Sequence, residues 1–92
     1  MKYKLNSDTI LVTVLDESML VNVNDAEGKI KDMRSVNDVG AYFWKQLEKC
    51  TDTDEVITNT MHVYDVTEER AKSAFIDFFF ALRDAGYLMV ED

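Results

Sequence analysis

VNDVGAYFW, residues 36–44, marks the point at which the chain changes from β-like to helical composition. Asn37 stands directly before a run of apolar residues at helical spacing, and an asparagine side chain can accept the free amide hydrogens of a first helical turn. Gly40 falls one turn into this run, where the lack of a side chain allows another element to approach closely, and Trp44 offers a large surface for core packing. The segment predicts a helix from about residue 38 to 49. Its apolar residues at helical spacing are Val39, Tyr42, Phe43, Leu47 and Cys50.

The sequence before this segment predicts three strands. Residues 9–15 and 19–23 are rich in β-branched side chains, and residues 16–18 supply turn chemistry between them, which is typical of a hairpin. A second turn follows over residues 24–28, in which Gly28 is free to take a positive φ. Residues 29–35 then form a third strand, and its low apolar content predicts a position at a sheet edge.

The sequence after this segment predicts two more helices. A helix begins near Thr53, with Thr51 or Thr53 as its N-cap. A third helix begins at residues 67–70 and ends at Gly86, which is placed to adopt the left-handed conformation. Residues 87–90 leave as a short extended tail that returns to the sheet or to the helical core. The apolar stripes are Val56, Ile57, Thr60, Met61 and Tyr64 on the second helix, and Ala71, Ala74, Phe75, Phe78, Leu82 and Ala85 on the third.

The order of three strands and three helices predicts an α+β fold, because one face of the sheet must be covered by the helices. With 92 residues, 47% of them hydrophobic, the chain fits a single domain spanning residues 1–92.

Charge and composition limit the partners and the compartment. Eighteen acidic and ten basic side chains give a net charge of −8, which disfavours nucleic acid and anionic lipid surfaces. The single cysteine, Cys50, fits a reduced compartment. The first residues lack the apolar stretch of roughly 7 to 15 residues that a signal peptide needs, and no apolar run approaches the roughly 18 residues of a membrane span. These features predict a cytoplasmic protein.

The chain lacks the residues that catalysis would need. His62 is the only histidine, and the sequence around it and Cys50 has no feature of a catalytic triad. Structural zinc requires roughly four thiolate or imidazole ligands, and the spacing of a calcium loop is missing. Asp52, Asp54 and Glu55 are better explained as complements to the positive end of the second helix. We therefore expect no enzyme activity, no cofactor and no metal.

The segment from Val36 to Trp44 resembles the signature of the PqqD family, in which an aliphatic residue and asparagine are followed by a small polar residue, glycine, and then an apolar residue and tryptophan. The spacing of Asn37, Gly40 and Trp44 matches this signature. The second and third helices also follow the family pattern, so the resemblance covers most of the chain. Val39 departs from it, because the family commonly has threonine there.

The resemblance implies a winged-helix-like domain that binds the leader of a ribosomally synthesised precursor peptide and presents it to a separate modifying enzyme, such as a radical SAM protein, a cyclodehydratase or a leader peptidase. In such domains the leader adds as a strand beside the third strand and packs against the third helix. Backbone groups of an edge strand would bind it with little dependence on side chains. Basic side chains there would attract acidic leader residues, although protection of the edge from aggregation explains them equally well. The edge residues are Lys29, Ile30, Lys31, Asp32, Met33 and Arg34.

The third helix carries the other half of the predicted site. At about 100° per residue, Ile76 and Phe80 project opposite the core face, where apolar residues need a partner. A peptide, a second copy, the enzyme or the C-terminal tail could each cover them. The flanks of the core face are alternative groove walls, formed by Arg70, Ala74 and Asp77 on one side and by Lys72 and Phe79 on the other. The predicted contacts on this helix are Arg70, Ser73, Ala74, Ile76, Asp77 and Phe80.

Two alternative hypotheses stay open from the sequence. A winged-helix DNA-binding regulator has the same elements, but the helix face bearing Ile76 and Phe80 lacks the several basic residues that hold phosphates. The other hypothesis is a structural scaffold subunit that forms a homodimer through the same apolar pair.

Overall fold

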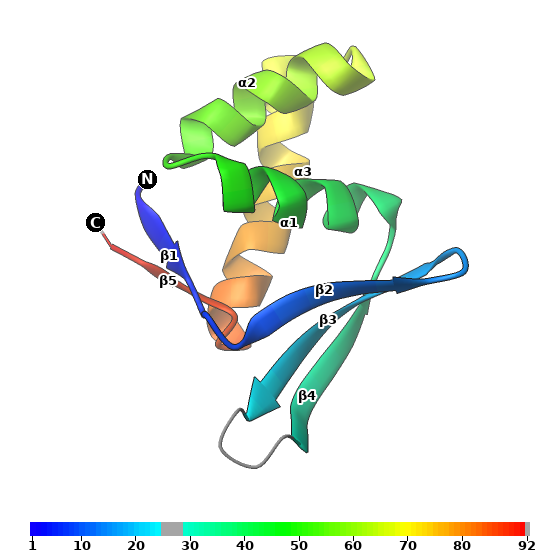
Figure 1. Ribbon diagram of the computed structural model, residues 1–92. Coiled ribbons are helices and arrows are strands. Elements are labelled where there is room, and N and C mark those ends of the chain that lie inside the picture. Colours follow the sequence, from blue (N-terminus) through cyan, green and yellow to red (C-terminus); the bar gives the residue numbers. More distant parts are fainter. Residues whose placement is uncertain (25–28, 92) are drawn as a thin grey trace.

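The computed structural model describes residues 1–24 and 29–91 of the chain. The described elements confirm the predicted α+β class, with a three-stranded antiparallel sheet followed by three helices, and add a small two-stranded sheet (Figure 1). The elements are β1 (Tyr3–Leu5), β2 (Thr9–Val14), β3 (Glu17–Asn24), β4 (Lys29–Val36), α1 (Asp38–Lys49), α2 (Thr53–Tyr64), α3 (Glu68–Asp84) and β5 (Leu88–Val90).

The hairpin of β2 and β3 has a shorter turn than the sequence predicted. Val14 pairs with Glu17, so that Leu15 and Asp16 alone form the loop, and the predicted turn over residues 16–18 was placed too late. Two-residue loops suit the twist of paired strands, which favours this tighter turn. Leu15 has a φ of 56°, a left-handed value that is sterically costly for a bulky residue, and it is 93% exposed.

β4 lies at an edge of the sheet, whose strand order is β2-β3-β4, as its low apolar content predicted. The predicted turn over residues 24–28, including Gly28, falls largely outside the described residues.

A β-bulge interrupts the pairing of β4. Asn22 pairs with Asp32 and Val23 pairs with Ile30, which leaves Lys31 without a partner in the ladder. A bulge disrupts the regular row of backbone groups. The bulge therefore divides β4 into a short paired segment at residues 29–30 and a longer one at residues 32–36.

The small sheet of β1 and β5 contains a strand that the sequence did not predict. Leu5 pairs with Leu88, so the C-terminal tail joins β1 rather than the main sheet. The hydroxyl of Tyr3 lies 2.7 Å from the carbonyl oxygens of both Leu47 and Cys50, either of which can accept its hydrogen. A three-residue strand shows no usable periodicity, and its partner lies at the opposite end of the sequence.

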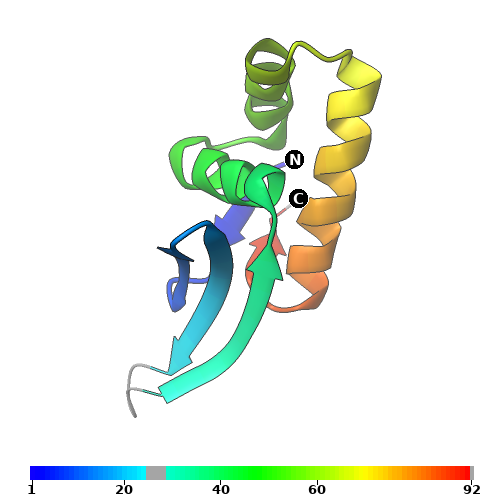
Figure 2. The same ribbon diagram turned by 90° about the vertical axis from the view of Figure 1, so that its right-hand side faces the viewer.

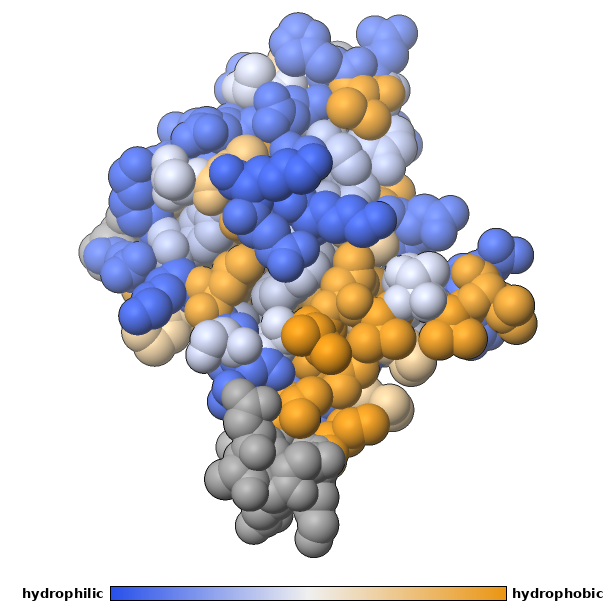
Figure 3. All heavy atoms as spheres, viewed as in Figure 1, coloured by the Kyte–Doolittle hydropathy of each residue, from blue (hydrophilic) through white to orange (hydrophobic). Residues whose placement is uncertain are grey.

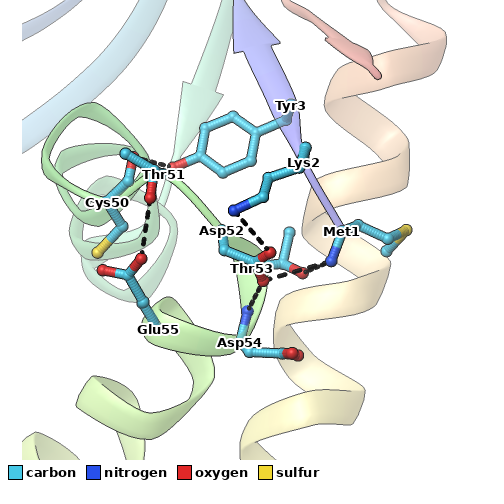
Figure 4. A network of polar contacts seen from close by, with 9 residues as sticks. All are labelled: Met1, Lys2, Tyr3, Cys50, Thr51, Asp52, Thr53, Asp54 and Glu55. Atoms are coloured by element: carbon cyan, nitrogen blue, oxygen red, sulfur yellow. Dashed lines mark hydrogen bonds and ion pairs between the residues drawn. The ribbon is translucent and has the colours of Figure 1, made fainter. Parts of the chain in front are cut away.

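The start of α2 is tied to Met1 and Lys2, which precede β1, by polar contacts (Figure 4). Asp52 caps the helix by accepting from the N–H of Asp54 at 2.9 Å, so the predicted cap at Thr51 or Thr53 was wrong. Thr53 is instead buried in the first turn of the helix. The hydrogen bond from Asp54, helped by an ion pair with Lys2 at 3.4 Å, holds the pKa of Asp52 below its usual value.

The other helix ends follow the predicted chemistry. The Oδ1 atom of Asn37 accepts from the N–H of Gly40 at 2.7 Å, and the Oγ1 atom of Thr67 accepts from the N–H of Arg70 at 3.2 Å. Gly86, just beyond α3, has a φ of 85°, as the sequence predicted. Side-chain caps therefore define where α1 and α3 begin.

Aromatic side chains fill the core between the helices and the sheets. Trp44 is 1% exposed, which confirms its predicted packing role. The rings of Phe43 and Phe75 meet edge to face, with centroids 5.3 Å apart. Val39, predicted on the apolar stripe of α1, is instead exposed.

The buried face of α3 is rotated relative to the prediction. Phe79 lies fully in the core, whereas Phe78 is half-buried and Ala74 is exposed. The cause is the small sheet, because the ring of Phe79 packs edge to face against Tyr3 of β1, with centroids 6.0 Å apart. The buried residues of α3 are Ala71, Phe75, Phe79 and Leu82.

Candidate functional site

A groove separates the free edge of β4 from α3. Figure 2 shows β4 and the C-terminal half of α3 side by side. One hollow of about 240 Å³ lies between them, and a second of about 190 Å³ continues toward the N-terminus of α3. The two hollows share Asn37, Gly40 and Phe78. The remaining lining residues are Arg34, Ser35, Val36, Ala81 and Leu82 in the first, and Val39, Phe43 and Ala74 in the second.

Gly40 and Phe78 form the floor where the two hollows meet. A Cβ atom at position 40 would lie 3.1 Å from Cε1 of Phe78, 3.2 Å from Cβ of Val36 and 3.3 Å from Oδ1 of Asn37. These separations are tighter than ordinary van der Waals contact. The close approach predicted for Gly40 is therefore an approach by Phe78, and it sets the depth of the groove.

Side chains of β4 alternate between the groove and the opposite side of the sheet. Asp32, Arg34 and Val36 lie on the side of the buried Leu20, with which Arg34 is paired across the ladder. Ile30 and Met33, also predicted as site residues, lie on the other side and are about half exposed. The side chains of Lys29 and Lys31, two further predicted residues, lie outside what the structure describes.

Asp32 is held by an internal hydrogen bond. The hydroxyl of Tyr87 donates to Oδ2 of Asp32 at 2.7 Å and links the end of α3 to β4. Burial of the phenol, with the hydrogen bond to Asp32, raises the pKa of Tyr87 to about 12. This hydrogen bond therefore engages the carboxylate of Asp32 within the protein. Arg34, two residues later on β4, is the basic side chain that lines the first hollow.

The predicted residues of α3 divide between two flanks. Ala74 lines the groove, and at about 100° per residue Arg70 and Asp77 fall on the same flank. Ser73 is exposed on the other flank, together with the half-buried Ile76.

Phe80, the remaining predicted residue of α3, shares the flank of Ile76 and lies away from the groove. It packs partly against the core, and the guanidinium of Arg83 stacks over its ring at 4.6 Å from the centroid. Phe80 is therefore largely covered by its own chain.

Several groove residues were missed by sequence reasoning. Phe78 was placed in the core, and Ala81 was not considered. Asn37 and Gly40 were recognised for a cap and a close approach, but not as residues that line a groove. The signal for Phe78 was the spacing itself, because Ala74, Phe78 and Ala81 recur every three or four residues and form one stripe.

Known catalytic arrangements find no support in the described residues. Burial raises the pKa of the Cys50 thiol, the opposite of an activated cysteine, and His62 is exposed in the last turn of α2. Within residues 1–24 and 29–91, no group of three or more His, Cys, Asp or Glu side chains is placed to hold a metal ion.

The charges of α3 do not favour a nucleic acid. The helix carries four acidic and three basic side chains, and one of the basic ones, Arg83, pairs with Asp84 at 3.1 Å. A phosphate-binding helix requires a cluster of free basic residues. For the part of the chain that is described, none of the helices combines the length and apolar character needed to cross a membrane.

Comparisons with known proteins identify a family and a fold for this chain. The family described as coenzyme PQQ synthesis protein D (PqqD) matches residues 14–88. The structure of TbiB1 in complex with the TbiA(beta) leader peptide is similar, with a TM-score of 0.74, 20% identity and coverage of 97% of this chain and 98% of that chain. Lasso peptide synthetase B1 complexed with the leader peptide has a TM-score of 0.75, 14% identity and coverage of 98% and 100%. No curated protein sequence matches the chain.

Proposed function

The chain belongs to the PqqD family, and from this premise we propose that it binds the leader of a ribosomally synthesised precursor peptide by strand addition and presents it to a separate modifying enzyme. TbiB1 and lasso peptide synthetase B1, which share the fold, were both determined with leader peptides bound. Their low identity to this chain limits that support to the fold. The local geometry therefore carries the proposal.

The observation that carries it is the free edge of β4 facing an apolar groove. An edge strand has backbone N–H and C=O groups that a peptide in extended conformation can pair with. The groove beside this edge offers Phe78, Ala81 and Ala74 as an apolar wall. An added strand would thus gain backbone hydrogen bonds on one side and side-chain contacts on the other.

The groove also defines the class of peptide. Successive residues of an added strand point to opposite faces, so every second leader residue would face α3. Apolar leader side chains would face the wall at Phe78, whose ring packs closely on the backbone of Gly40. An acidic leader residue would be favoured near Arg34, whose guanidinium could form a charge-assisted hydrogen bond.

The modification of the precursor peptide is assigned to a separate enzyme. The described residues supply no activated nucleophile, and the groove contains no histidine or cysteine. A radical SAM protein, a cyclodehydratase and a leader peptidase are the candidate classes, because each can act on a peptide whose leader is held elsewhere.

The test is a titration with the fluorescently labelled leader of the precursor peptide encoded beside this gene. We expect saturable binding, with amide shifts at residues 32–36 and along the stripe of Ala74, Phe78 and Ala81. Phe78→Ala should weaken binding by about tenfold or more, because a well-placed aromatic wall contributes more than about 1.4 kcal/mol. Phe80→Ala is the matched control, since Phe80 is also a half-buried aromatic residue of α3 but lies outside the groove.

Two results would contradict the proposal. One is the absence of saturable binding by the wild-type chain. The other is an equal loss of affinity in Phe78→Ala and Phe80→Ala, which would mean that the peptide does not distinguish the two flanks of α3.

A further inference from the structure

The sheet of β2, β3 and β4 has an apolar face that points away from the core. Residues paired across an antiparallel ladder share a face, and the face that includes Leu20 belongs to the core cluster. The opposite face carries no residue of that cluster. We call this opposite face the outer sheet face; its apolar residues are Ile10, Val12, Val14, Met19, Val21, Val23, Ile30 and Met33.

The outer sheet face is more apolar than the face that packs on the core, which is the reverse of the usual arrangement. Antiparallel sheets with one solvated side normally bury their apolar residues and expose their polar ones. Here the core-facing side combines three apolar residues with six polar or charged ones, whereas Glu17 and Ser35 are the polar residues on the outer side. The core-facing residues are Leu11, Leu20, Val36, Thr9, Thr13, Ser18, Asn22, Asp32 and Arg34.

The outer sheet face is open to solvent at four of its eight apolar residues, whereas Val21 is 5% exposed. Ile10, Val14, Ile30 and Met33 are 50%, 57%, 59% and 49% exposed. Figure 3 shows apolar side chains gathered over β2 and β3 and continuing to the hairpin tip. Contiguous apolar patches on monomers rarely exceed roughly 300 to 600 Å², and patches of that size are often functional.

An acidic corner borders this face. Asp16, Glu17 and Asp38 line one hollow between the hairpin tip and the start of α1. Among the described side chains, no lysine or arginine forms an ion pair with any of the three. A partner that covers the face would meet these carboxylates at its rim, where basic residues are favourable.

We propose that the outer sheet face is the docking surface for the modifying enzyme, and that the enzyme meets it with an apolar patch bordered by basic side chains. This inference rests on the proposed function, because it takes the partner to be the enzyme that receives the leader. The surface is separate from the groove, since the side chains of β4 that face α3 are Asp32, Arg34 and Val36, whereas those on the outer face are Ile30 and Met33.

A second copy of the chain fits this face less well. Two copies would each bring a net charge of −8 to the contact. Asp16, Glu17 and Asp38 of one copy would also meet the same carboxylates or an apolar surface on the other. Charge therefore favours a basic partner over a second copy.

The experiment measures the affinity of the full chain for the modifying enzyme encoded beside its gene, with the labelled leader titrated in parallel. The double variant Ile10→Glu/Val14→Glu places charges on β2, the strand farthest from the groove. We expect it to weaken enzyme binding at least tenfold and to leave leader affinity unchanged. Val63→Glu is the matched control, because Val63 is 61% exposed on α2.

Glu17→Lys provides a second variant that does not touch the apolar positions. Reversal of this exposed charge should weaken enzyme binding and reduce its dependence on salt, whereas Glu48→Lys on α1 should have little effect. Unchanged enzyme affinity in both outer-face variants, or no enzyme binding by the wild type, overturns the inference.

Two further outcomes separate the hypotheses. Self-association of the wild type that disappears in Ile10→Glu/Val14→Glu, measured by sedimentation, would overturn the inference in favour of a second copy. Enzyme binding that depends on the outer face without any leader binding would support the docking surface and refute the proposed function.

Discussion

Phe78 of α3 lies directly over the backbone of Gly40 in α1, so close that a Cβ atom on residue 40 would be 3.1 Å from its ring. Replacement of glycine by alanine within a helix normally stabilises by roughly 0.5 to 1 kcal/mol. Here we expect Gly40→Ala to destabilise instead, by about 1 kcal/mol, because the ring and Val36 must move. Urea unfolding followed by the fluorescence of Trp44 measures the change.

The same contact predicts an interaction energy between positions 40 and 78. In a Phe78→Ala background the closest obstacle is gone, so Gly40→Ala should cost less than in the wild type. An equal cost in both backgrounds would show that Val36 and Asn37, rather than Phe78, limit the space at residue 40.

The N-caps of α1 and α3 offer a matched pair of variants. Asn37→Ala and Thr67→Ala each remove one side-chain hydrogen bond to a first-turn amide, and each should cost about 1 kcal/mol. Only Asn37 lines the groove, so only Asn37→Ala should also weaken leader binding. Asn37→Asp should restore the stability, because a carboxylate caps as well as an amide. Equal effects of Asn37→Ala and Thr67→Ala on leader affinity would argue against a groove role for Asn37.

Stability should fall with pH above about 10. Burial raises the pKa of Tyr87, and also of Tyr3, to about 12, from an ordinary value of 10.0. The folded state therefore holds these protons more tightly than the unfolded state, and their contribution is complete below pH 10 and lost as the pH rises through 12. Free energies of unfolding between pH 8 and pH 12 measure the decline.

Tyr87→Phe isolates the share of one phenol in this decline. At neutral pH the variant should lose about 1 kcal/mol with the hydrogen bond to Asp32. Between pH 10 and pH 12 its stability should fall less steeply than that of the wild type, with a remaining slope from Tyr3 and from Tyr42, whose pKa burial also raises. A slope identical to that of the wild type would mean that Tyr87 ionises as readily in the folded state as in the unfolded one.

Leu15 at the hairpin tip should be replaceable with a gain in stability. Its φ of 56° costs roughly 1 to 2 kcal/mol for a residue with a side chain, and its exposed side chain contributes little packing. Leu15→Gly should therefore raise the free energy of unfolding by about 1 kcal/mol. Leu15→Ala is the control, because it removes the side chain and keeps the backbone cost. A gain of the same size in both variants would point to the exposed leucine side chain instead.

Local chemistry made much of the fold predictable. The hairpin, the edge position of β4 and the start of α1 followed from β-branched runs, low apolar content and the cap at Asn37. Gly86 marked the end of α3 because a left-handed residue there favours glycine. Each of these signals is contained within a few neighbouring residues, which is why the sequence alone was sufficient.

Long-range packing was not predictable in the same way. β1 is only three residues long and exists because β5 returns to it from the other end of the chain. That small sheet in turn buries the flank of α3 that carries Phe79 and leaves Phe78 for the groove. The sequence left two flanks of α3 open as groove walls, one with Ala74 and one with Phe79, and the position of β1 distinguishes them.

The alternation of side chains along β4 has a thermodynamic consequence. A leader strand added to its edge would continue both faces of the pleated sheet, so every second leader residue would extend the outer face beside Met33. An enzyme bound to the outer sheet face would therefore contact both this domain and the leader. Linkage then requires that the leader tighten enzyme binding by the same factor by which the enzyme tightens leader binding. Such positive cooperativity would need no change in the conformation of the domain, and it would let the enzyme discriminate loaded from empty copies.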